Sequence, residues 1–230
     1  NQATPQIHIK ARFLEVPKGT LSGLSKMVVI HNQPVRSNQL ASIMGILTGE
    51  NFKIVLRNLE ARDGVEILAE PEVTTTSGRQ TQMRATEIQT IVTNVVFQDN
   101  LTNSTIVPQT GSVETGPILD VVPYVLSDGY TINLTLIPSL TEFLGYGTPT
   151  NAVGPVNNAG DHLPVILPKF SVRQAVASVN IWDGQTVVLG GLPAKNIVGD
   201  ITGIAKSLAR NKELLVFVTV TIVDPARSEE

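Results

Sequence analysis

Apolar and polar residues alternate in parts of this chain, notably from Ile7 and from Tyr130, with the period of two that a two-faced β-strand requires. Near the start, Ile7, Ile9, Ala11 and Phe13 alternate with more polar neighbours. Similar segments follow from residue 65 onward and are separated by turn-forming pairs such as Ser-Gly and Asp-Gly. They cover residues 65–75, 81–93, 118–126, 130–136, 172–182, 186–189 and 214–223. The pattern predicts a mainly β protein.

Helical spacing is confined to a few short segments. Asn51 is the expected N-cap of an amphipathic helix that ends at Asp63-Gly64, because apolar residues recur after it at i, i+3, i+4 and i+7. Residues 37–47 place apolar side chains on one side and are also expected to be helical, and residues 200–209 show the same spacing. We therefore expect two or three short helices.

Two inserts interrupt the strands. Residues 94–115 are rich in Asn, Thr and Gln, with expected hairpin arms at 95–97 and 105–107. Residues 140–169 are rich in Gly, Pro and Asn and are too long for an ordinary β-turn. Connections of this length in compact domains are usually functional or disordered.

The charge distribution adds to this picture. With 42% hydrophobic and 16% charged residues, the chain is not disordered, and its net charge of -3 argues against nucleic acid as a partner. No Lys or Arg occurs between Arg84 and Lys169, although seven acidic residues do. Because soluble surfaces mix both signs, this stretch is not expected to face ordinary solvent on all sides. A neutral β domain with long polar loops is the alternative.

Candidate chemistry is sparse. The chain has no Cys, and His8, His31 and His162 are isolated from other metal ligands. Glu66, Glu70 and Glu72 share one strand face but have no adjacent acid–base partner. We expect no catalytic residue, no metal site and no cofactor, and hence no enzyme.

Five segments resemble, in order, the bacterial outer-membrane secretins. The most specific covers residues 179–192 and is similar to the V-x-x-x-D-G-Q-T-V-V-I-G-G-L signature, with the residues Asp183, Gly184, Gln185, Thr186, Gly190 and Gly191. The other four segments are less specific. The family's opening segment is similar to residues 7–16 and its I-L-S-x-P segment to residues 65–75. Its L-x-V-x-P segment is similar to residues 116–123 and its closing E-L-x-I-F-x-T segment to residues 213–219. The chain departs from the family at 86–93, where the usual Gly and Pro are missing, at Val220, and after Leu192.

The resemblance implies one secretin core domain, 1–230, whose strands join those of neighbouring copies in a giant double-walled β-barrel. Residues 1–64 would supply the N-terminal strand and helices. Residues 65–230 would supply the barrel strands, with a gate insert at 94–115, a second insert at 140–169 and a lip helix at 200–209. The implied partners are further copies of the chain, outer-membrane lipid, secreted protein or pilus cargo, and inner-membrane secretion components reached through domains outside this chain.

The resemblance also implies a gated outer-membrane channel for protein, a pilus or phage. Its gate hairpin and hinges would comprise Asn94, Phe97, Asp99, Gly111, Glu114 and Gly116. If they face inward, Asp99, Glu114, Asp120 and Glu142 would give a negative lumen; otherwise they are turn and edge residues. Two alternatives stay open: a structural ring or surface assembly with this fold but no transport, and a soluble periplasmic β binding domain.

Overall fold

The computed structural model describes residues 4–20, 42–99, 104–147, 166–192, 195–196 and 212–223. Within these residues the protein is mainly β, as predicted, with one α-helix. The elements are β1 (Gln6–Pro17), β2 (Ser42–Leu47), α2 (Gly49–Glu60), β3 (Glu66–Ala69), β4 (Glu72–Thr76), β5 (Thr81–Arg84), β6 (Glu87–Asp99), β7 (Ser104–Val125), β8 (Thr131–Tyr146), β9 (Pro168–Gln174), β10 (Ala177–Trp182), β11 (Thr186–Leu192), β12 (Lys195–Asn196) and β13 (Lys212–Val223).

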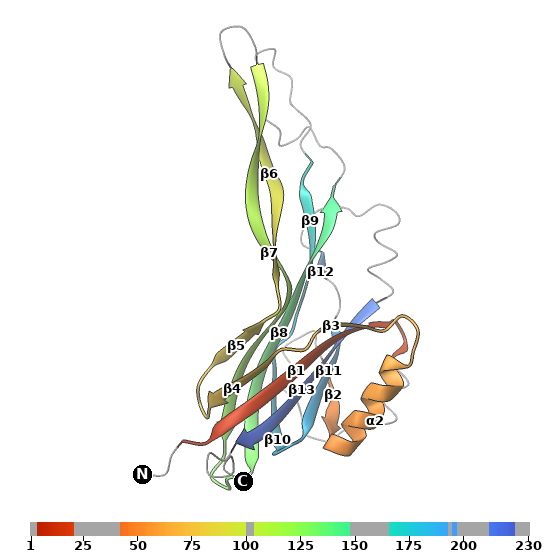
Figure 1. Cartoon of the computed structure of the whole chain (residues 1–230), viewed down its shortest axis with the longest axis vertical. Helices are drawn as coiled ribbons and strands as arrows, with labels where there is room; N and C mark the ends of the chain where they lie inside the picture. Colours follow the sequence, from red (N-terminus) through yellow and green to blue (C-terminus); the bar gives the residue numbers. More distant parts are fainter. Residues whose placement is uncertain are drawn as a thin grey trace, which may run out of the picture.

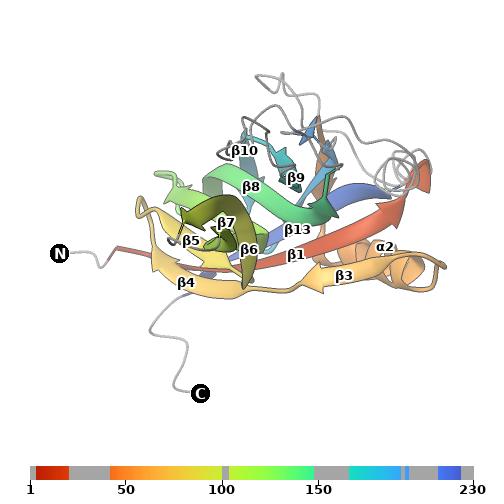
Figure 2. The same cartoon turned by 90° about the horizontal axis from the view of Figure 1, so that it is seen from above.

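The strands form two sheets that lie face to face (Figures 1 and 2). Sheet A has the order β2-β11-β13-β1-β3, with β4 also paired to β1. Sheet B has the order β12-β9-β8-β7-β5, with β10 also paired to β8 and β6 to β7. All of the described strand pairs are antiparallel.

The main core lies between the two sheets. The predicted alternation of β1 is confirmed, because Ile7, Ile9, Ala11 and Phe13 are all fully buried. They face equally buried side chains of sheet B, including Leu119 of β7 and the alternating Ile132, Leu134 and Leu136 of β8. Burial of each large aliphatic side chain contributes about 1.5–3 kcal/mol relative to its exposure. This core holds the two sheets together.

Helix α2 covers the outer face of sheet A and confirms the spacing predicted for residues 52–59. Val55 and Leu59 are buried, and the ring of Phe52 packs 5.4 Å from that of Phe217. Its ends differ from the prediction. Thr48 caps the N-terminus by accepting a hydrogen bond from the Asn51 amide, and Ala61 caps the C-terminus, so the helix begins and ends before the expected residues.

The helix expected at 37–47 is wrong for the described part of that segment. Residues 42–47 form the edge strand β2, which pairs with β11 from Thr186↔Leu47 to Gly190↔Ser42. A short apolar run fits a helix or a strand equally well by spacing alone, and here the open edge of β11 decides. Residues 37–41 and the lip helix at 200–209 lie outside the described residues.

Three predicted strands are broken in the structure. The segment 65–75 splits into β3 and β4 at Glu70-Pro71, 81–93 into β5 and β6, and 172–182 into β9 and β10. Proline is found at each break: Pro71 within the first, Pro117 accepting from the Ala85 amide, and Pro138 accepting from the Ala175 amide. Because proline has no N–H to donate, the ladder is interrupted at these points.

The two inserts differ. In the first, the predicted arms pair as expected, with Val96↔Val107 and Phe97↔Ile106. In the second, β8 continues to Tyr146 and β9 begins at Pro168, while residues 148–165 lie outside the described part of the chain.

Candidate functional site: the base of a projecting hairpin

A long β-hairpin extends beyond both sheets (Figure 1). We call it the arm; it comprises β6 and residues 104–115 of β7, paired from Glu87↔Thr115 to Asp99↔Ser104. The rest of β7 pairs with β5 and β8 inside sheet B. Among the arm's described side chains only Ile91 is buried. A two-stranded ribbon is marginally stable alone in water, so the arm's position depends on its attachment to the body.

The attachment centres on Gly116, one of the predicted hinge residues. Its φ is +120°, a value that side chains rarely allow. A Cβ atom there would lie 2.6 Å from the carbonyl oxygen of Ala85 and 3.0 Å from the Cα atom of Thr86. Strand β7 therefore leaves the body by passing closely over the break between β5 and β6, and only glycine fits that crossing.

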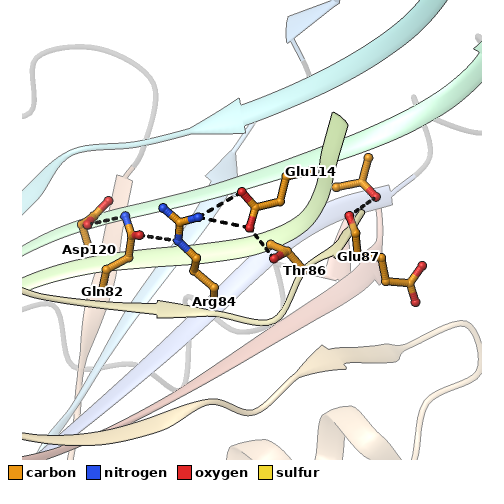
Figure 3. Close-up of polar contacts among 7 residues, drawn as sticks. Gln82, Arg84, Thr86, Glu87, Glu114 and Asp120 are labelled. Atoms are coloured by element: carbon orange, nitrogen blue, oxygen red, sulfur yellow. Dashed lines mark hydrogen bonds and ion pairs between the residues drawn. The ribbon is translucent and has the colours of Figure 1, made fainter. Parts of the chain in front are cut away.

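A group of polar side chains, which we call the clip, bridges the same break (Figure 3). The guanidinium of Arg84 in β5 contacts both carboxylate oxygens of Glu114 in the arm, at 3.2 and 3.0 Å. The Thr86 hydroxyl donates to Glu114 Oε1 at 2.6 Å. Arg84 also donates to Gln82, whose amide donates to Asp120 at 2.7 Å. The clip thus links sheet B to the first residues of the arm.

The clip also lowers the pKa of Glu114 below its usual range, mainly through the Thr86 hydroxyl and then through Arg84. A depressed carboxyl pKa stabilises the folded state at neutral pH, and this contribution is lost as the pH falls through the folded-state value, below about 4.3. The clip is therefore expected to loosen in acid.

We predict that Thr86→Val raises the pKa of Glu114 toward its usual value, because the variant keeps the shape of Thr86 but removes the donated hydrogen bond. NMR titration of the Glu114 carboxyl carbon measures the midpoint directly. Thr90→Val, an exposed change higher on the arm, is the matched control. An unchanged midpoint in Thr86→Val would contradict the role assigned to this hydroxyl.

The remaining gate residues lie further along the arm. Asn94 follows an irregularity in β6 and its side-chain oxygen accepts from the Val95 amide at 2.8 Å. Gly111 pairs with Ile91, and a Cβ atom there would lie 2.8 Å from Cγ2 of Thr93. Phe97 and Asp99 belong to β6, but their side chains are outside the described ones. The paired arm starts at Glu87, before the predicted insert.

The signature residues form the corner where the chain passes from sheet B to sheet A. Gly184 adopts a φ of +76°, and Asp183 accepts a hydrogen bond from the Ile222 amide at 2.7 Å. Gln185 accepts from the Trp182 amide, and the buried Thr186 hydroxyl lies 2.8 Å from that of Thr219. Gly190 and Gly191 belong to β11. The signature therefore specifies a structural corner fastened to β13.

The three described acids of the expected negative lumen all have partners. Glu114 binds Arg84, and Asp120 accepts from Gln82. Glu142 lies 3.0 Å from Arg173 and continues the core-facing positions of β8, so it points between the sheets. The position of Glu142 does not fit a lumen-facing acid.

The site that sequence reasoning missed is a buried charge cluster beside the hinge. Arg173 is 2% exposed and its Nη2 lies 3.0 Å from Glu15 of β1 and 3.0 Å from Glu142. Lys212 contacts Glu15 at 3.0 Å and Glu66 at 3.2 Å. The contact with Glu142 is an ion pair without an aligned hydrogen bond, and burial raises the pKa of Glu142. The sequence does contain one indication of this cluster. Glu15 occupies the next position in the alternating apolar series Ile7, Ile9, Ala11 and Phe13, so it places a charge on the face of β1 that is expected to be buried.

The three glutamates expected on one strand face are distributed over β3, β4 and the break between these strands, and each is an ion-pair partner. Glu70 contacts Arg12 at 2.9 Å, Glu72 contacts Lys10 at 3.3 Å, and Glu66 contacts Lys212. Among the described residues there is no cluster of three potential metal ligands. Within the same residues, no helix is both long and apolar enough to cross a membrane.

Comparison with known proteins identifies the class. The family described as "Secretin: Bacterial type II and III secretion system protein" matches residues 58–206. Because this match covers more than half of the chain, the chain belongs to the secretin family. The match confirms the predicted family. Secretins are outer-membrane channel proteins of bacterial secretion systems rather than enzymes. No curated protein matches the chain in sequence.

Several solved secretins resemble the fold at low identity. The type II secretin GspD of enteropathogenic Escherichia coli is 13% identical, with a TM-score of 0.41, over 97% of this chain and 71% of that one. The V. cholerae type IV competence pilus secretin PilQ is 14% identical, with a TM-score of 0.41, over 96% and 61%. The Salmonella SPI-1 injectisome secretin InvG domain is 10% identical, with a TM-score of 0.39, over 99% and 66%.

Proposed function

We propose that this secretin chain is one subunit of a closed homo-oligomeric ring in the outer membrane, and that the arm is its gate. The ring would export folded protein, a pilus or phage. The observation that carries this proposal is the arm itself: a two-stranded ribbon whose described side chains, except Ile91, are not buried, attached to sheet B through a glycine crossing and a polar clip, with few contacts to the body. A hairpin held in this way can obstruct a water-filled lumen and still move aside.

The sheet edges support assembly with further copies. Within the described residues, sheet B ends at β5 and β6 on one side and at β10 and β12 on the other. Open strand edges invite pairing with another chain, and a rotationally repeated interface removes them by closing a ring. Closure is required wherever strands cross lipid, because backbone groups cannot remain unpaired in hydrocarbon.

The gate is tested by shortening the arm. Residues 95–108 are removed and the paired residues Asn94 and Gln109 are joined by a two-residue Asn-Gly turn, which suits a hairpin. We expect rings of normal appearance by electron microscopy with a severalfold higher conductance in planar bilayers. Ser112→Ala, an exposed arm change that keeps its length, is the matched control.

Three results would contradict the proposal. Truncated rings that conduct no more than intact rings would show that the arm is not a gate. A monomeric particle by light scattering in detergent would instead favour a soluble β binding domain. Rings that are permanently open before truncation would favour a structural assembly without gating.

A further inference from the structure

The arm touches the body at a second point, above the clip. The backbone amide of Val92 in β6 donates a hydrogen bond to the hydroxyl of Tyr146, at 3.1 Å. Tyr146 is the last residue of β8. The neighbouring Ile91 is 3% exposed, and it is the only buried side chain among the described side chains of the arm. The body therefore covers the arm locally at this level.

Both strands are irregular where they meet. In β6 the register with β7 shifts between Val92 and Asn94. In β8 the register with β9 shifts between Phe143 and Tyr146, and Gly145 between them has a φ of +93°. Bulges of this kind re-aim a side chain relative to a regular strand. Each strand thus carries an irregularity at the contact.

The irregularity in β8 places Tyr146 in an aromatic group. Its ring lies edge-on to Phe143, with centroids 5.4 Å apart and an interplanar angle of 82°. Phe143 in turn packs 5.5 Å from Phe170 of β9, its partner in the ladder. Edge-to-face pairs at these separations are favourable. The tyrosine ring is held by its neighbours on sheet B while its hydroxyl meets the arm.

We propose that Tyr146 is a latch that holds the arm in its resting position. This inference rests on the proposed function of the arm as a gate. One neutral hydrogen bond changes an equilibrium by about twofold to tenfold. Such a contact biases each arm toward the docked position and yields when cargo pushes on it. Because every copy in a ring carries the same contact, the bias acts on all arms.

The test is Tyr146→Phe, which removes the hydroxyl and keeps the ring and its aromatic contacts. Hydrogen–deuterium exchange of assembled rings, followed by mass spectrometry, should show about twofold to tenfold faster exchange in peptides covering 88–96. The same rings should open more often in single-channel recordings. The thermal midpoint of the ring should not change. Tyr124→Phe is the matched control, because Tyr124 is an exposed tyrosine near the opposite end of sheet B.

The outcomes separate this inference from the gate proposal. Unchanged exchange at 88–96 in Tyr146→Phe would overturn the latch, whatever the truncated arm does. The latch would also be overturned if Tyr146→Phe rings exchange faster at 88–96 but open no more often than wild-type rings, provided that rings with the truncated arm do leak. If truncated rings do not leak, the gate proposal fails, and exchange still decides whether Tyr146 docks the arm.

Discussion

Replacing Gly116 with alanine is expected to displace the arm and open the ring. The new Cβ atom would lie 2.6 Å from the Ala85 carbonyl oxygen, which is closer than such atoms approach, and that neighbour is backbone rather than a flexible side chain. The φ of +120° adds backbone strain of about 1–3 kcal/mol. Both costs are relieved if β7 moves away from the break between β5 and β6. We therefore expect lower stability and a severalfold higher conductance.

The matched control is Gly129→Ala. Gly129 also has a positive φ, +71°, but a Cβ atom there meets nothing within 4 Å. The Gly129→Ala variant should therefore lose only about 1–2 kcal/mol of stability, the penalty for a side chain in the left-handed region, and its conductance should not change. Denaturant unfolding and bilayer recordings measure the two effects. Equal behaviour of both variants would show that the crossing at Gly116 does not position the arm.

Replacing Arg173 with methionine is expected to destabilise the protein by about 3–5 kcal/mol, the usual cost of removing one partner from a buried ion pair. Arg173 is the cation between Glu15, which is 6% exposed, and the partly buried Glu142. Without it, Glu142 has lost its ion partner and Glu15 retains only Lys212. Denaturant unfolding at neutral pH gives the loss directly.

Two further measurements separate charge from packing. The triple variant Glu15→Met, Glu142→Met and Arg173→Met should recover most of the loss, because apolar replacement of a whole buried ion cluster is often neutral. The single variant should also be less destabilised in acid. Burial already raises the pKa of Glu142, so protonation as the pH falls removes a buried unpaired charge. If Arg173→Met lowers the free energy of unfolding by less than about 1 kcal/mol, the ion pairs of Arg173 contribute no more than exposed surface pairs do, and the prediction is wrong.

Much of the fold could be predicted from local pattern. Alternation located β1 and β8, a continuous apolar run located β13, and helical spacing located α2, because all of these elements pack apolar side chains against the core. The hairpin arms at 95–97 and 105–107 were also predictable, since both are short β-prone runs on either side of polar turn residues. These features depend on residues that are neighbours in sequence.

The features that were predicted wrongly or missed depend on residues that are far apart in sequence. The strand β2 takes its conformation from β11, and the breaks at Ala85 and Ala175 depend on Pro117 and Pro138 in other strands. Glu15 and Arg173 meet only because the two sheets stack. For the candidate site, Gly116 and Glu114 were named from the family pattern, but their partners Arg84, Ala85 and Thr86 were not. Tyr146 gave no signal, because its contact requires irregularities in two strands.

The arm's two strands are anchored unequally. Strand β7 runs without interruption from the arm to Val125 and pairs with β8 from Gly116 to Val125, whereas the other strand is interrupted between β5 and β6. A sideways force on the tip therefore enters the body mainly through one continuous strand, where many backbone hydrogen bonds share the load. The broken side can bend and return without unzipping the sheet. If the arm is the gate proposed above, we expect it to bend at the interrupted strand and to return to its original position while β7 stays paired with β8.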